Sequence, residues 1–173
     1  MTVTGKTIAE NRADEAEALV KELTIWSRQE SGLLSLEQEA ALKIAYADLA
    51  FRKGALPTAR AWYRKVAEAA EYEGTEMHLD AALGSVMIDR VSKNFGAALT
   101  ELDKLMAMKN PAFRIRVRYA RAEVFMDQEN YAEALAELEV AVGLDPTLGP
   151  RARLDTDFEP LDENAEVIRM TGE

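Results

Sequence analysis

The chain of 173 residues contains no cysteine, a single histidine and few aromatic residues, which make up 7% of it. Without cysteine there is no disulfide framework, no thiolate nucleophile and no cysteine-based metal site. The single histidine, His78, has no second imidazole with which to share a transition metal. We therefore expect no catalytic residues, no metal and no cofactor, and we expect that the chain is not an enzyme.

Long apolar runs and an excess of basic residues are also missing. No stretch approaches 18 uninterrupted apolar residues, and the first twenty residues are too rich in charge for a signal peptide. The net charge of −10 repels nucleic-acid phosphates. We expect a soluble, cytoplasmic protein that does not insert into membranes and does not bind nucleic acid.

What the chain does contain favours helices. Apolar residues make up 48% of it, which is enough for a continuous core. Alanine, leucine and glutamate are abundant while runs of β-branched residues are scarce, and this composition is typical of an all-α fold. The length fits one compact domain or array.

Three segments follow one pattern. The clearest is 118–146, RYARAEVFMDQENYAEALAELEVAVGLDP; the others are 47–67, ADLAFRKGALPTARAWYRKVA, and, more loosely, 85–105, SVMIDRVSKNFGAALTELDKL. Ala59, Ala98 and Ala134 occupy equivalent positions, 39 and 36 residues apart. Such spacing predicts a repeated helical unit in which a small residue marks a close approach between two helices.

Glycine, proline and serine residues in and near these segments predict where helices begin and end. Gly54 marks a turn and Pro57 suits the first turn of the following helix. In the clearest segment, Gly143 is predicted to stop a helix, and Pro146 cannot continue it. Ser35 is predicted to cap a helix that begins just after it.

This pattern resembles the tetratricopeptide repeat (TPR), a helix-turn-helix unit of about 34 residues. The resemblance implies an all-α, TPR-like superhelical array of antiparallel helix pairs, about three in number, with capping helices at both ends. We expect an N-terminal capping segment at 1–35, helix pairs over 36–149 (about 36–72, 73–110 and 111–146), and a C-terminal capping segment at 150–173. A generic helical bundle is the alternative, because Ala/Leu amphipathic patterns occur there as well.

The two ends carry the features of caps. Residues 13–26 form an amphipathic pattern, which predicts a solitary capping helix or half of a repeat. Residues 155–161, DTDFEPL, resemble the D-P-D-F-x-x-L closing segment of bacterial TPR proteins, with Thr156 in place of the first proline. A short helix after Pro160 is expected to cover the last exposed apolar face.

In TPR proteins the first helix of each pair lines a concave groove that binds a partner, and the resemblance carries this role to equivalent positions here. The implied groove residues are Ile44, Asp48, Phe51 and Arg52 from the first pair, Asp80, Leu83, Met87 and Arg90 from the middle pair, and Arg116, Tyr119, Glu123 and Met126 from the last. Apolar members would anchor a bound helix or extended peptide. The alternative is that several of them are ordinary core residues.

One short segment is strongly basic in an otherwise acidic chain. Arg114, Arg118 and Arg121 share a helix face, with Arg116 pointing elsewhere. Either they receive a partner's acidic segment, or they pair within the chain with Glu101, Asp103 or Glu133.

These observations predict a scaffold or adaptor that binds a peptide or helical segment of another protein in a concave groove. Two alternatives stay open: a small secretion-type chaperone that keeps cargo soluble, which rests on architecture alone, and self-assembly as a homo-oligomer.

Overall fold

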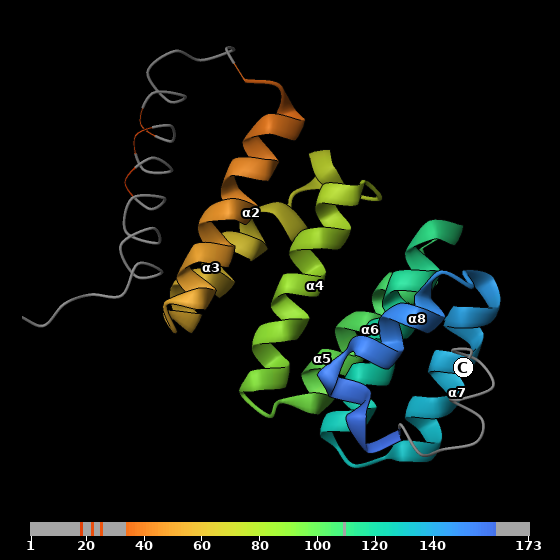
Figure 1. The fold of residues 1–173 in the computed structure, drawn as a ribbon. Coiled ribbons are helices and arrows are strands. Elements are labelled where there is room, and N and C mark those ends of the chain that lie inside the picture. Colours follow the sequence, from red (N-terminus) through yellow and green to blue (C-terminus); the bar gives the residue numbers. More distant parts are fainter. Residues whose placement is uncertain (1–17, 19–21, 23–24, 26–33, 109, 162–173) are drawn as a thin grey trace, which may run out of the picture. The chain divides into compact units, whose positions relative to one another are not determined.

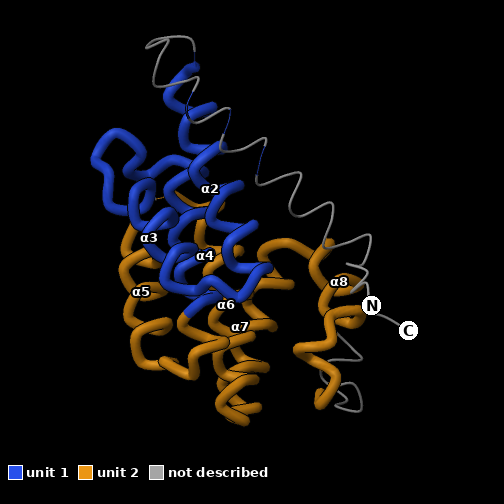
Figure 2. Tube along the Cα trace, turned by 90° about the vertical axis from the view of Figure 1, so that its left-hand side faces the viewer, with its two compact units in different colours: residues 1–88 blue, residues 89–173 orange. Residues whose placement is uncertain are grey.

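A computed structural model describes residues 18, 22, 25, 34–108 and 110–161. Every regular element among them is helical, so the prediction of an all-α chain is confirmed for this part (Figure 1). The chain divides into two compact units, residues 1–88 and 89–173, coloured separately in Figure 2. None of the described helices is both long and apolar enough to cross a membrane.

Unit 1 contains α2 (Leu36–Arg52), α3 (Leu56–Ala67), the 3-10 helix η1 (Ala70–Tyr72) and all but the last turn of α4 (Glu76–Val91). Ser35 caps α2 as predicted. Its Oγ accepts a hydrogen bond from the backbone N–H of Gln38 at 3.2 Å, and Gln38 Oε1 accepts one from the Ser35 N–H at 2.9 Å. This reciprocal pair satisfies two backbone donors that a helix start leaves without partners.

The core of unit 1 is built from small residues around two tyrosines. Ala47 and Ala59 are fully buried where α2 meets α3, which allows the two helix backbones to approach closely. The same requirement applies to α4 at Gly84, where a Cβ atom would overlap the ring of Tyr63. Small side chains therefore set the spacing of all three helices.

Unit 2 contains α5 (Phe95–Ala107), α6 (Pro111–Asp127), α7 (Tyr131–Leu144), α8 (Leu148–Leu154) and the 3-10 helix η2 (Thr156–Leu161). Helix α6 packs on both α5 and α7. Asn110 caps it by accepting a hydrogen bond from the Ala112 N–H at 3.1 Å. The core members shared by α6, α7, α8 and η2 are Tyr119, Ala122, Met126, Ala134, Leu138, Val142, Ala152, Phe158 and Leu161.

The turns that follow α2, α4 and α6 have one geometry. Gly54, Lys93 and Glu129 each adopt a left-handed conformation, with φ of 73°, 58° and 59°. In each turn the following residue donates to a carbonyl five residues earlier: Ala55 to Ala50, Asn94 to Asp89 and Asn130 to Phe125, at 2.8 to 2.9 Å. This is the Schellman motif. The left-handed residues are 39 and 36 residues apart, the same spacing as Ala59, Ala98 and Ala134.

Some expectations need correction and some cannot be compared. Helix α7 continues through Gly143 and ends at Leu144, because Asp145 is the first residue with an extended backbone conformation. Helix α8 crosses the predicted boundary at 149/150. The helix predicted at 13–26 lies outside the described residues except for positions 18, 22 and 25, and so does the helix predicted after Pro160.

Candidate functional site: the predicted partner-binding residues

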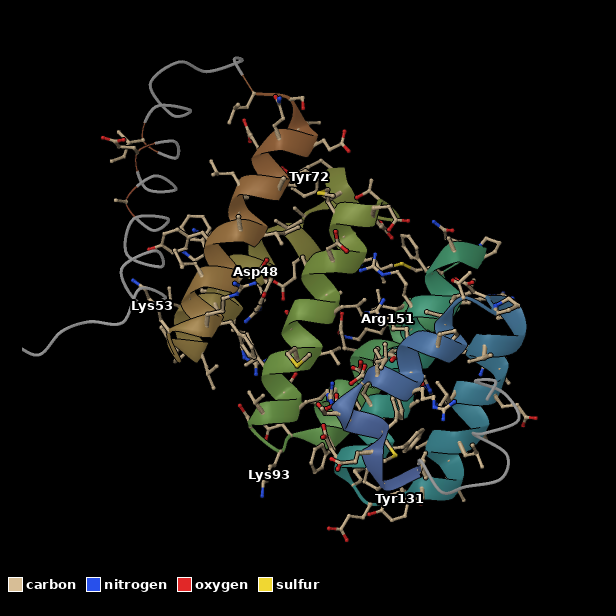
Figure 3. The ribbon with its side chains drawn as sticks, viewed as in Figure 1. Asp48, Lys53, Tyr72, Lys93, Tyr131 and Arg151 are labelled. Carbon is tan, nitrogen blue, oxygen red and sulfur yellow. The ribbon has the colours of Figure 1, made fainter. Side chains whose placement is uncertain are left out.

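In unit 1 the predicted residues of α2 present alternating apolar and charged chemistry. Ile44 and Phe51 are half-buried against the core, while Arg52 is exposed. Asp48, labelled in Figure 3, is exposed as well. Asp48 is fixed in place because its Oδ1 accepts a hydrogen bond from the Tyr63 hydroxyl on α3 at 2.5 Å. Burial, followed by the bond to Asp48, raises the pKa of Tyr63, so the phenol remains a donor.

The predicted residues of α4 in this unit follow the same helix face. Asp80, Leu83 and Met87 lie at i, i+3 and i+7, and Met87 is 38% exposed. Asp80 and Leu83 are half-buried. Among these three residues, Met87 is therefore the most exposed.

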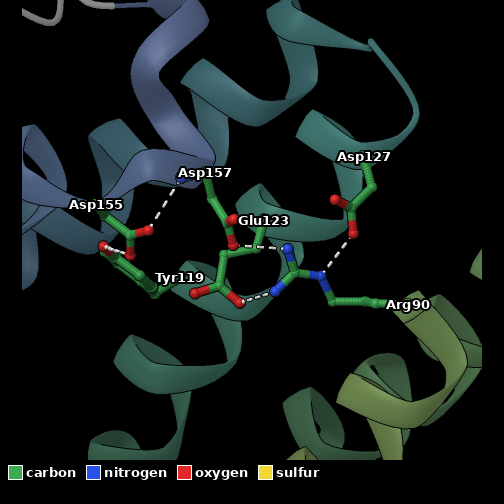
Figure 4. Close-up of polar contacts among 6 residues, drawn as sticks. All are labelled: Arg90, Tyr119, Glu123, Asp127, Asp155 and Asp157. Carbon is green, nitrogen blue, oxygen red and sulfur yellow. Dashed lines mark hydrogen bonds and ion pairs between the residues drawn. The ribbon is translucent and has the colours of Figure 1, made fainter.

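Arg90, at the end of α4, belongs to unit 2 and lies at the centre of an ionic cluster (Figure 4). Its guanidinium donates from Nη1 to Glu123 at 2.6 Å, from Nε to Asp127 at 2.7 Å and from Nη2 to Asp157 at 2.7 Å. The Arg90 side chain is only 5% exposed. Three carboxylates on one buried cation leave the cluster with an excess of negative charge.

The same region holds an aromatic contact. Tyr119 is buried, and its ring meets Phe158 edge to face with centroids 5.3 Å apart. The Tyr119 hydroxyl donates to Asp155 Oδ2 at 2.8 Å. Met126 is buried in the same core. Residues 155–161, which we call the closing segment, therefore contact Tyr119 and share a core with Met126, two positions that the resemblance assigned to a partner. We call Arg90, Tyr119, Glu123 and Met126 the closing-segment site.

Burial and neighbouring carboxylates shape the ionisation of this site. Burial raises the pKa of Glu123 to about 7; Arg90 opposes the shift, while Asp157 and Asp155 add to it. Burial likewise raises the pKa of Tyr119, and the hydrogen bond to Asp155 reinforces the effect. For Arg90, burial acts to lower the pKa, but its bonds to Asp127, Glu123 and Asp157 outweigh this and raise it. Glu123 is thus poised to gain or lose a proton near neutral pH.

The basic segment pairs within the chain. Arg121 contacts Asp103, as the intramolecular alternative predicted, and also donates to Glu137 at 2.9 Å. Arg118 donates to the other oxygen of Glu137 at 2.7 Å. The prediction offered Glu101, Asp103 or Glu133 and did not name Glu137, which lies one turn of α7 beyond Glu133. Arg114 and Arg116 are exposed.

Sequence reasoning recognised the closing segment as a cap but did not assign Asp155, Asp157 and Phe158 to particular partners. The signal was present, because two carboxylates flank Thr156 directly before an aromatic residue. Their partners Arg90 and Tyr119 lie far away along the chain, and no local pattern links them. His78 is buried near the start of α4. Among the described residues, no group of acidic and histidine side chains is arranged to hold a metal ion.

Neither the sequence, compared with protein-family models and with curated proteins, nor the structure, compared with solved structures, gave a match.

Proposed function

We propose that this chain is a TPR-like scaffold or adaptor that binds a peptide or helical segment of another protein. On this proposal the three helix pairs stack as a superhelical array, and the first helix of each pair supplies the binding residues. The repeated Schellman turns and the matching alanines support a repeated unit.

One observation carries the proposal. The face of α6 that the repeat register assigns to a ligand already holds a short, non-α segment, because the closing segment contacts Tyr119 and shares the Arg90 guanidinium with Glu123. The contacts are those of peptide recognition: a buried aromatic anchor, carboxylates on a guanidinium, and a phenol donating a hydrogen bond. A helix face that holds a tethered peptide has the chemistry to hold a free one.

The equivalent helices of unit 1 carry exposed side chains among the described residues. Asp48 and Arg52 are exposed on α2, and Met87 is partly exposed on α4. A methionine adapts its shape to an incoming side chain, and the two charges fix register and orientation. We propose these residues as the primary contacts of the partner segment.

Site-specific photo-crosslinking tests the proposal. A photo-reactive amino acid replaces Arg52 or Met87 in separate variants, and matched controls carry it at Ala61 of α3 or Ala97 of α5, which are equally exposed positions on the second helices. All variants must melt at the wild-type temperature. We expect one protein to be captured from Arg52 and Met87 and not from the controls, and its purified form to lose affinity for Arg52→Glu.

Other outcomes decide against the proposal. Equal capture from all four positions would place binding elsewhere. Capture of a second copy of this chain would favour self-assembly, and capture of many unrelated apolar proteins would favour the chaperone alternative.

A further inference from the structure

The closing segment shows which chemical groups its site recognises. Asp157 binds the Arg90 guanidinium, Asp155 accepts from Tyr119, and Phe158 packs edge to face on the same tyrosine. Leu161 completes the buried contacts of the segment. These four residues fit the pattern Asp-x-Asp-Phe-x-x-Leu, and each has a defined place in the site.

The closing segment is held by features that permit exchange. Its backbone is a six-residue 3-10 helix, a type whose hydrogen bonds are less well aligned than those of an α-helix, and Pro160 inside it has no N–H to donate. At the edge of the cluster, the side chains of Asp127 and Asp157 are 33% and 38% exposed, which gives solvent access to the ion pairs.

The charges of the cluster also oppose tight closure. Arg90, from the end of α4, is the cation of the ion pairs, and Glu123 and Asp127 of α6 and Asp157 of η2 all bind it. Asp155 accepts a hydrogen bond from the Tyr119 hydroxyl. The guanidinium carbon of Arg151 in α8 lies 5.4 Å from the centroid of the Tyr119 ring. When the segment leaves, Asp155 and Asp157 move away from Glu123, so the repulsion among these carboxylates falls while Arg90 keeps two partners. Release of the closing segment therefore costs less free energy than the number of its contacts suggests.

We propose that the closing-segment site binds Asp-x-Asp-Phe-x-x-Leu segments of a partner protein, and that residues 155–161 are a tethered competitor for it. This inference rests on the proposed scaffold function and names the chemistry of one ligand. The partner's two carboxylates replace those of Asp155 and Asp157, and its aromatic and aliphatic side chains replace Phe158 and Leu161.

A different protein is favoured over a second copy of this chain as the occupant. Exchange between two copies replaces each contact with an identical one, and it forfeits the high effective concentration, on the order of millimolar, that a short tether provides. A different protein can compete because its flanking residues add contacts that residues 155–161 do not make.

The test measures binding of a labelled synthetic peptide, LDTDFEPL, to the full chain by fluorescence anisotropy. The wild type is compared with Phe158→Ala and with the milder Asp157→Asn, each of which weakens the tethered competitor. A scrambled peptide of the same composition is the control. We expect Phe158→Ala to bind the peptide about tenfold or more tightly than the wild type does, because the lost aromatic anchor frees the site. Asp157→Asn should fall between them.

Thermal melts and Tyr119→Phe complete the design. If Phe158→Ala no longer melts cooperatively, the comparison of Asp157→Asn with the wild type decides the question. Tyr119→Phe, added to the weakened variant, should lower peptide affinity because it removes the donor to the first carboxylate.

The proposal is overturned if the weakened variants bind no more tightly than the wild type, or bind the scrambled peptide equally. Light scattering over a concentration series adds one more arm, because wild-type dimers that disappear in Phe158→Ala would make a second copy the occupant. Crosslinking at Arg52 and Met87 does not depend on the closing segment, so failure here leaves the proposed function standing.

Discussion

The first and last helix pairs share a register but differ in what they expose. Ala47 and Ala122, and likewise Ala59 and Ala134, are 75 residues apart and fully buried. At the same offset, Asp48 is exposed whereas Glu123 lies in a buried ionic cluster. Equivalent positions therefore give the same helix packing but different surfaces. The difference arises from the segment that follows the last pair, because its Asp157 shares Arg90 with Glu123.

The partners of the two carboxylates illustrate the contrast. Asp48 accepts from a neutral phenol and faces solvent, so water stabilises its charge. Glu123 has a guanidinium partner, but burial and two further carboxylates offset that attraction. We therefore expect substitutions at the exposed Asp48 to cost less free energy of unfolding than substitutions at the charges bound to Arg90.

The largest effect should come from removing the buried cation. Arg90→Met leaves Glu123, Asp127 and Asp157 without their shared partner, and breaking a buried ionic group typically costs about 3–5 kcal/mol. Chemical denaturation measures the loss. The matched control is Arg64→Met in unit 1, whose ion pair with Glu68 is exposed, and little change is expected. Similar losses in both variants would remove the distinction between the units.

Gly84→Ala should break the packing of unit 1. The added Cβ would overlap the Tyr63 ring, which the hydrogen bond to Asp48 holds in position, so overpacking should cost about 3 kcal/mol. Gly96→Ala on α5 is the control, because a Cβ there meets nothing within 4 Å. Hydrogen exchange should show faster opening of α2, α3 and α4. An unchanged exchange pattern would contradict the close approach of α4 to Tyr63.

Glu123 should give unit 2 an unusual dependence on pH. Because its pKa is raised from 4.5 to about 7 in the folded chain, the native state binds a proton that the unfolded state does not between these values. This group therefore adds stability as the pH falls from about 7 to 4.5, by about 3 kcal/mol. Glu123→Gln should lose this contribution, whereas the exposed Glu133→Gln should keep it. Parallel pH profiles for the wild type and Glu123→Gln would refute the assignment.

The smallest effects on stability should come from removing the two hydrogen bonds that join a tyrosine hydroxyl to a carboxylate. Tyr63→Phe removes the donor to exposed Asp48, where water can replace it, so the cost should be about 0.5 kcal/mol. Tyr119→Phe removes the donor to half-buried Asp155 and should cost about 1–1.5 kcal/mol. Denaturation of both variants tests this ranking, and the reverse order would mean that unit 2 is the more solvated of the two.

Turns show how far local sequence carries a structural prediction. The turn at Gly54 could be predicted from the sequence because glycine adopts positive φ without steric cost. Lys93 and Glu129 adopt the same conformation in equivalent turns, and nothing in those side chains signals it. Hydrogen bonds that close the turn hold them there, so the repeat spacing was a better guide than residue type.

The sequence by itself determined the helical composition, the equivalence of the buried alanines and the cap at Ser35, because each depends on periodicity or on neighbours within a few residues. Only the tertiary structure decided that Tyr119 and Met126 are covered and that Arg90 binds three carboxylates. The members of that cluster lie between residues 90 and 157, so their contacts form only when the closing segment folds back on α6. Their burial and shifted pKa values follow from that long-range placement, which repeat register does not encode.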